Sequence, residues 1–162
     1  MVRFDVSSLV KAQPGTSLTL DIDAGPEHLT DLEVDFLKGT IRVTRVQGGL
    51  LVQGIVQSQL QQECVRCLET VEIPITLELE ETFRLAGAAP KPGTPYAVSE
   101  GGWLDLTPLL REQSWLAIPM KPLCTPNCKG LCPQCGANLN LESCTCEQTH
   151  IDPRLAALKE LL

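Results

Sequence analysis

Eight cysteines fall into four close pairs along this 162-residue chain. The pairs are Cys64 and Cys67, Cys124 and Cys128, Cys132 and Cys135, and Cys144 and Cys146. Two thiolates separated by only a few residues can reach one metal ion, and tetrahedral zinc takes two such pairs at about 2.3 Å per Zn–S bond. Four pairs make two complete sets of ligands, so the spacing predicts two zinc ions per chain.

Disulfides, an iron–sulfur cluster and a redox-active dithiol are the alternatives to zinc. Asp5 and two serines interrupt the first ten residues, where a signal peptide needs an unbroken apolar stretch, and no segment is long enough to span a membrane. We therefore expect a cytoplasmic chain, in which persistent disulfides are rare. The spacing from Cys124 to Cys135 differs from the known cluster pattern, and the βαβ context of a thioredoxin is missing. Zinc is the favoured interpretation.

The order of the pairs suggests how they share two ions. Cys132-Pro-Gln-Cys135-Gly is typical of a zinc knuckle, because proline and glycine bend the backbone so that its amides face the sulfurs. Its nearest complementary pair, Cys144 and Cys146, would close a local site. The two remaining pairs would then join a turn between strands to a segment after a helix. Interleaved pairings stay open, and His150 could replace one thiolate, although we expect it at the surface.

The chain is acidic, with a formal net charge of −7. This charge repels phosphate backbones at long range and gives no support to broad nonspecific nucleic-acid binding, so any RNA contact must be local. Three basic residues, Arg66, Lys121 and Lys129, lie within or beside the cysteine pairs. They either offset the negative charge of zinc-bound thiolates or form a small patch for RNA or a protein partner.

Residues 1–85 have the alternation of half-buried antiparallel strands. Apolar and polar residues alternate from Leu18 to Ile22 and again from Val71 to Leu79. Apolar segments at 32–36, 40–46 and 50–60 lie between them, and glycine turns at Lys38-Gly39 and Gln47-Gly48-Gly49 separate these segments. The pattern predicts an antiparallel β-meander.

Pro74 cannot donate a ladder hydrogen bond, so its strand is expected at an edge of the sheet or paired on one side only. Cys64 and Cys67 lie between the two longest predicted strands. They are therefore expected on the turn that connects those strands.

A helix is expected within residues 103–119. Thr107-Pro108 is typical of a helix start, and Pro119 ends the pattern. The residues expected on its apolar face are Leu109, Leu110, Leu116 and Ala117. Trp115 falls off that stripe, and we expect it to pack beside the sheet rather than to meet a base or a partner.

The remaining segments complete a single α+β domain over 1–162. Residues 86–102 are rich in glycine and proline, which predicts a mobile surface loop. Residues 121–150 have the composition of metal-held loops, and Asp152-Pro153 begins a C-terminal helix over 152–162 with leucines on one face. The predicted fold is an antiparallel β-meander sheet with short helices and a Cys-rich zinc-binding C-terminal segment.

Several motifs from Cys64 to the end of the chain occur together. They are C-x-R-C at Cys64–Cys67, Lys-Pro-Leu-Cys124, Cys128-Lys-Gly-Leu-Cys-Pro-Gln-Cys-Gly-Ala-Asn-Leu-Asn140 and Asp152-Pro-Arg-Leu-Ala-Ala-Leu158. With these motifs the chain strongly resembles the YceD family, which is associated with accumulation of large-subunit ribosomal RNA in bacteria and chloroplasts. Some members lack the Cys-Pro-x-Cys part yet keep C-x-R-C with a later pair of potential ligands, which favours the grouping above. The 86–102 loop is often strongly acidic in the family, whereas here its only charged residues are Lys91 and Glu100.

Catalysis is not expected. His28 and His150 are the only histidines, and full zinc sites leave no open position for water. The resemblance implies a zinc-binding factor that supports 23S ribosomal RNA accumulation and large ribosomal subunit assembly, with ribosome-assembly proteins or the 23S rRNA precursor as partners. The net charge favours protein contact. The alternative is a thiol-redox or metal-sensing protein that uses its C-x-x-C pairs.

Overall fold

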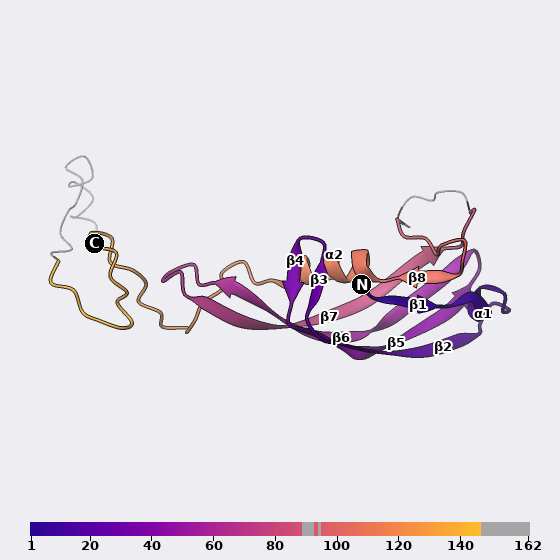
Figure 1. The fold of residues 1–162 in the computed structure, drawn as a ribbon, viewed down its shortest axis with the longest axis horizontal. Coiled ribbons are helices and arrows are strands. Elements are labelled where there is room, and N and C mark those ends of the chain that lie inside the picture. Colours follow the sequence, from indigo (N-terminus) through magenta and orange to yellow (C-terminus); the bar gives the residue numbers. More distant parts are fainter. Residues whose placement is uncertain (89–92, 94, 147–162) are drawn as a thin grey trace, which may run out of the picture.

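The computed structural model describes residues 1–88, 93 and 95–146. Within them the chain is mostly antiparallel β-sheet with short helices, as expected (Figure 1). The elements are β1 (Arg3–Asp5), α1 (Ser7–Val10), β2 (Ser17–Ala24), β3 (Glu27–Leu29), β4 (Leu32–Val34), β5 (Phe36–Val46), β6 (Gly49–Glu63), β7 (Thr70–Arg84), β8 (Trp103–Asp105) and α2 (Thr107–Ala117). No helix among these residues is long and apolar enough to cross a membrane.

The main sheet has four antiparallel strands in the order β2-β5-β6-β7. Alternate residues are buried, as Ile41 and Val43 are on β5, because one face of the sheet carries the core and the other meets water. β7 is an edge strand, and Pro74 pairs only with Gln59 on its β6 side. The edge position expected for this proline is confirmed.

Smaller elements cover one face of the main sheet (Figure 1). They are α2, the two-stranded β1–β8 sheet and the β3–β4 hairpin. Leu29 of β3, Leu104 of β8 and Leu110 of α2 are fully buried in the core. Each element therefore contributes apolar side chains to a single interior above the sheet.

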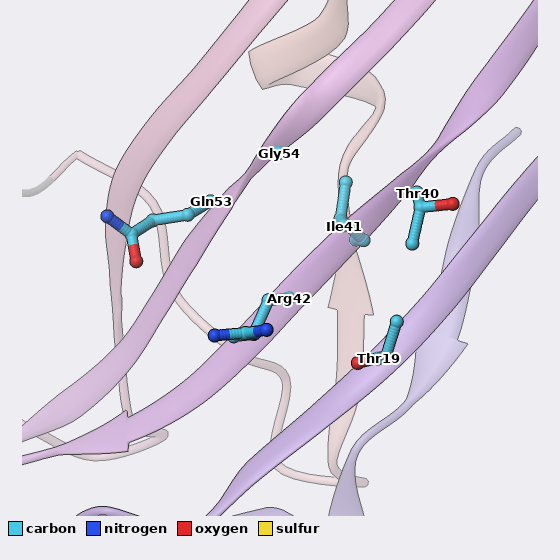
Figure 2. Close-up of a pocket in the computed structure, with 6 residues that line it drawn as sticks. All are labelled: Thr19, Thr40, Ile41, Arg42, Gln53 and Gly54. Atoms are coloured by element: carbon cyan, nitrogen blue, oxygen red, sulfur yellow. The ribbon is translucent and has the colours of Figure 1, made fainter.

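The opposite face of the main sheet is polar. Figure 2 shows Thr19, Arg42 and Gln53 on three neighbouring strands, where they line a shallow hollow together with Gly54. All three side chains are exposed. This face accounts for the polar half of the alternation in the sequence.

Lys38-Gly39 is not a turn, contrary to the sequence-based expectation. β5 runs unbroken through it from Phe36 to Val46. A Cβ atom on Gly39 would lie 2.2 Å from the backbone oxygen of Ile55, so glycine is required there by the close approach of β5 and β6. The turn at Gln47-Gly48-Gly49 is confirmed, since β5 and β6 form a hairpin in which Gly48 has a φ of 87°.

Helix α2 is shorter than expected, and its last turn is less buried than expected. Residues 103–105 pair with β1 as strand β8. Leu109 and Leu110 are buried and Ala117 packs against the core, as expected, and Ser114 is buried beside them. Leu116 follows Leu109 by two turns on the same side of the helix, but it lies in the last turn, where the core no longer covers that side. Leu116 is 78% exposed and Trp115 is 46% exposed, so the expected packing of both side chains is wrong.

Part of the segment 86–102 is anchored to the sheet. Val98 is buried and donates its N–H to the carbonyl of Arg84 at 2.8 Å, while the ring of Tyr96 stacks on Phe83 with 5.1 Å between ring centroids. The described residues of the segment 86–102 therefore do not form a surface loop throughout, contrary to the expectation. The helix expected over 152–162 and His150 lie outside the described residues.

The β6–β7 hairpin extends past the rest of the main sheet. β5 stops pairing with β6 at Phe36, which faces Gln59, whereas β6 and β7 remain paired as far as Glu63 and Thr70. The last part of this hairpin is thus a two-stranded ribbon (Figure 1), and the turn at its end begins at Cys64. Two strands alone are marginally stable in water, so the ribbon needs another contact to hold its end.

Candidate metal centres

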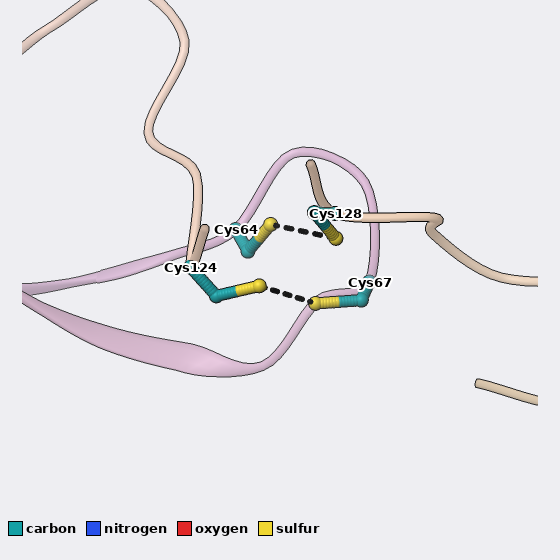
Figure 3. A group of neighbouring side chains, drawn as sticks. All are labelled: Cys64, Cys67, Cys124 and Cys128. Carbon is teal, nitrogen blue, oxygen red and sulfur yellow. Dashed lines mark hydrogen bonds between the residues drawn. The ribbon is translucent and has the colours of Figure 1, made fainter. Parts of the chain in front are cut away.

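Two cysteine pairs that are far apart in sequence meet at the end of this ribbon. Cys64 and Cys67 lie on the β6–β7 turn, and Cys124 and Cys128 come from the segment after α2 (Figure 3). All four Sγ atoms lie within 4.8 Å of one another. The Sγ–Sγ distance is 3.8 Å between Cys64 and Cys128 and 3.5 Å between Cys67 and Cys124. We call this group the tip cluster.

Backbone hydrogen bonds shape the turn that carries the first pair. Leu68 donates its N–H to the carbonyl of Cys64 at 2.9 Å, and Cys64 donates its own to the carbonyl of Glu69 at 2.9 Å. Leu68 adopts a left-handed φ of 60°, which is unusual for a leucine and closes the turn sharply. Both sulfurs consequently face the later segment.

Three further hydrogen bonds fasten that segment to the turn. Val65 donates its N–H to the carbonyl of Pro122 at 3.0 Å, and Leu131 donates its N–H to the carbonyl of Arg66 at 3.1 Å. The Arg66 guanidinium donates to the carbonyl of Cys128 at 2.7 Å. The turn and the segment therefore dock through the backbone as well as through sulfur.

The spacing of the sulfurs suits a tetrahedral ion. Zn–S bonds of about 2.3 Å place the sulfurs of a tetrahedral site about 3.8 Å apart, which matches the two distances above. A disulfide requires about 2.05 Å. None of the eight cysteines forms a disulfide in this structure.

Hydrogen-bond donors favour thiolates in the tip cluster. Burial acts to raise the pKa of the Cys64 thiol, but backbone N–H groups, led by that of Cys67, outweigh it and lower the pKa to about 6. Burial also opposes the lowered pKa of Cys128, whose sulfur accepts a hydrogen bond from the Asn140 amide at 3.3 Å. Because thiolates are the form that binds metal, these donors prepare the site for a cation.

The other four cysteines form a second group, the tail cluster. It comprises Cys132, Cys135, Cys144 and Cys146, whose Sγ atoms also lie within 4.8 Å of one another. Cys132 donates its N–H to the carbonyl of Ala137 at 2.8 Å and accepts at its carbonyl from Gly136 at 2.9 Å, which forms the expected knuckle. Backbone N–H groups, led by that of Cys135, lower the pKa of the Cys132 thiol to about 6.

Neighbouring sulfurs oppose one another's ionisation in both clusters. The N–H of Glu69 acts to lower the pKa of Cys67, but burial and the nearby sulfurs, led by that of Cys124, raise it to about 12. In the tail cluster, the neighbouring sulfur of Cys135 is the main cause that raises the pKa of Cys146 to about 12. A divalent cation would cancel this repulsion and bind all four thiolates. Both clusters therefore fit a metal ion, and they are the two groups that the spacing predicts.

The family model described as "Large ribosomal RNA subunit accumulation protein YceD" matches residues 52–162, a span that contains both clusters. The chain belongs to the YceD family. No solved structure matches it.

Relatives of this YceD chain occur in bacteria and plants. An uncharacterized protein of Mycobacterium tuberculosis is 36% identical over 75% of this chain and 60% of its own length. The protein YlbN of Bacillus subtilis, also uncharacterized, is 27% identical over 92% of this chain and 90% of its own. The chloroplastic "Large ribosomal RNA subunit accumulation protein YCED homolog 1" of Zea mays is 29% identical over 69% of this chain and 49% of its own. The chain thus spans only about 60% of the mycobacterial relative.

Three basic residues of the YceD chain lie around the tip cluster as predicted. Arg66 contacts the later segment through two hydrogen bonds: its side chain donates to the carbonyl of Cys128, and its carbonyl accepts from the N–H of Leu131. Lys121 and Lys129 are exposed, and among the described residues neither side chain forms an ion pair. A contact with RNA or with a partner stays a prediction for all three.

Sequence reasoning assigned no role to two asparagines that support the tip cluster. Asn140 donates to the sulfur of Cys128 at 3.3 Å and accepts from the N–H of Lys129 at 2.8 Å. Asn138 accepts from the Asn140 amide at 2.9 Å and donates to Glu69 at 3.2 Å. Asparagine often bonds to nearby backbone in such loops, so the Asn-Leu-Asn of the YceD motif was an available signal.

Gly130→Ala should loosen the docking of the tail on the turn. Gly130 has a φ of 78°, and an added Cβ would lie 3.0 Å from the carbonyl oxygen of Arg66. That oxygen accepts the N–H of Leu131, so we expect faster amide hydrogen exchange at Leu131.

Gly136→Ala is the matched control for this YceD variant. Gly136 has a φ of 75°, but an added Cβ would meet nothing within 4 Å. In both variants an alanine must adopt a left-handed backbone conformation, which costs roughly 1–2 kcal/mol. Only Gly130→Ala also places its Cβ against the carbonyl of Arg66. Equal exchange rates at Leu131 in the two variants would show that the close approach is unimportant.

Proposed function

We propose that this chain is a non-catalytic zinc-binding factor of the cytoplasm that supports 23S ribosomal RNA accumulation and assembly of the large ribosomal subunit. The family description supplies the process. The observation that carries the proposal is the tip cluster, in which two cysteine pairs far apart in sequence join the end of a long hairpin to the segment after α2. Zinc then acts as a structural cross-link.

Each ion would be held by four protein thiolates. Cys64, Cys67, Cys124 and Cys128 would hold one, and Cys132, Cys135, Cys144 and Cys146 the other. A bound zinc ion would supply a rigid tetrahedral link between loops that have little regular structure. Four protein ligands leave no position for a reacting water, which supports a scaffold rather than an enzyme.

Burial argues against the thiol-redox alternative for the tip cluster. Cys64 is fully buried, and Cys67 and Cys128 are 4% and 2% exposed. A redox thiol must meet its oxidant or its partner thiol at the surface. The tip cluster is therefore better suited to a closed metal site.

The proposed partners are ribosome-assembly proteins or the 23S rRNA precursor. A net charge of −7 disfavours long-range attraction to RNA and favours basic proteins. Arg66, Lys121 and Lys129 are exposed and would make a local RNA contact.

Deletion of the chain should lower mature large-subunit RNA, and large subunits relative to small ones, without loss of a defined metabolic reaction. Sedimentation profiles and RNA quantification measure this, with a strain complemented by the intact chain as control. Crosslinking in the same cells separates RNA from protein partners. Normal ribosome profiles in the deletion strain would remove the assembly role and favour the redox or metal-sensing alternative.

A further inference from the structure

The last turn of α2 leaves large apolar side chains uncovered. Trp115 is 46% exposed and Leu116 is 78% exposed, although both belong to a helix whose other side is in the core. We propose that Trp115 and Leu116 form a docking surface for a basic protein segment that carries an apolar side chain. We call it the Trp115 surface; it lies on α2, over the main sheet and away from the tip cluster (Figure 1).

The indole of Trp115 is held in place by polar contacts. Asp31, on the turn between β3 and β4, accepts hydrogen bonds from the Trp115 side chain and from two nitrogens of Arg111, at 2.5 and 2.6 Å. Thr30 adopts a left-handed φ of 67°, which turns the chain sharply beside Asp31. A large aromatic ring fixed before binding loses little conformational entropy when a partner covers it.

Two grooves meet at Trp115 and Asp31. One, of about 530 Å³, is bounded by Arg111, Glu112 and Leu116 on the helix. The other, of about 360 Å³, is bounded by Glu33 of β4, by Asp35 between β4 and β5, and by Gln61 and Gln62 of β6. The ring therefore stands between two depressions, each of which can receive a side chain of a partner.

The charges around these grooves select the partner. The carboxylates that line them are Asp31, Glu33, Asp35 and Glu112, and Arg111 is the one cation among the lining residues. With four negative charges against one positive, the surface carries a net charge of −3. Within a Debye length of about 8 Å, this attracts lysine and arginine and repels phosphate.

This negative charge disfavours stacking of a nucleic-acid base on the Trp115 ring. A stacked base brings its phosphate close to the ring, where Glu33, Asp35 and Glu112 lie. A basic protein segment instead pairs its cations with these carboxylates and its apolar side chain with Leu116. Proteins that bind RNA backbones carry basic segments, and a factor in ribosome assembly would encounter such proteins. This choice of partner rests on the proposed function.

Tryptophan fluorescence tests the proposal on the whole purified chain. Trp103 and Trp115 are its two tryptophans, so Trp103→Phe makes Trp115 the reporter. The probes are a synthetic peptide of lysine and leucine, the same peptide with serine in place of leucine, the same peptide with glutamate in place of lysine, and a single-stranded RNA oligonucleotide. Protection of Trp115 from acrylamide quenching reports binding.

We expect the lysine–leucine peptide to protect Trp115 and to bind at least about tenfold more tightly than the lysine–serine peptide. The glutamate peptide and the RNA should give no protection. Leu116→Ser, and separately the pair Glu33→Gln and Asp35→Asn, should each weaken the peptide about tenfold. Leu116 and Glu33 are exposed and Asp35 is half-buried, and asparagine at position 35 can still accept the hydrogen bond from Gln59, so the fold should be unaffected.

Ile55→Ser is the matched control, because Ile55 is 56% exposed on the polar face of the main sheet. It should leave peptide binding unchanged. Equal binding of the lysine–serine peptide, unchanged binding by Leu116→Ser, or protection of Trp115 by the RNA would each overturn the proposal. None of these results depends on ribosome profiles, so failure here is distinct from failure of the proposed function.

Discussion

Cys64→Ser should cost the protein one of two zinc ions and release the segment around Cys124 from the β6–β7 turn, while the main sheet stays folded. The tip cluster is separate from the main core, and among the described residues Leu123 and Leu131 are the apolar side chains that pack against its cysteines. With one ligand lost, the few backbone hydrogen bonds at the turn must hold the segment alone. Structural zinc contributes strongly to the folding of the loops that bind it.

Two measurements check this expectation. Elemental analysis of protein purified without added metal should give two zinc ions for the intact chain and one for the variant. Hydrogen exchange at the amides of Val65 and Leu131, which bond across the docked segments, should accelerate roughly 100-fold or more.

Cys132→Ser is the comparison that separates the two clusters. It should remove the tail ion and expose the amide of Gly136, which bonds within the knuckle, while Val65 stays protected. Loss of both ions from either variant, or global unfolding of both, would contradict two independent sites. Iron with visible charge-transfer absorption in the intact chain would reject zinc.

Gly39→Ala should destabilise the main sheet by about 3 kcal/mol or more, a large part of the stability of an ordinary domain. The new Cβ would lie 2.2 Å from the backbone oxygen of Ile55 and 2.8 Å from the Cα of Val56. Both neighbours are backbone atoms of β6, so relief requires the strands to separate. The midpoint of urea unfolding should fall with little change in its slope.

Gly25→Ala serves as the control for the Gly39 variant. Gly25 lies just after β2, and an added Cβ would meet nothing within 4 Å. Its effect should stay within about 0.5 kcal/mol. A Gly39→Ala midpoint as high as that of Gly25→Ala would show that β5 and β6 tolerate a side chain between them.

The features that follow from short-range patterns could be predicted from the sequence. The spacing of the cysteines predicts the two groups of four that the structure brings together. Alternation predicts the antiparallel strands, and the missing N–H of Pro74 predicts an edge. In each case one local rule decides the structure, because ligand reach, strand periodicity and hydrogen-bonding capacity belong to the residues themselves.

The features that depend on distant neighbours could not be predicted in this way. Glycine permits both a turn and a close approach of strands, and only the position of Ile55 shows which of these Gly39 provides. The exposure of Leu116 depends on the register of α2 against the core, which its own leucine spacing does not determine. Asn140 gains its role from the sulfur of Cys128, which it meets only in the folded loop.

The projecting β6–β7 ribbon has a practical consequence for how damaged variants are recognised. A melting curve is dominated by the unfolding of the large core, whose buried residues do not include the tip cysteines. A substitution that prevents metal binding at the tip cluster should therefore leave the melting temperature close to normal. A screen that sorts variants by thermal shift would therefore not detect such a substitution. A measurement of metal content would detect it.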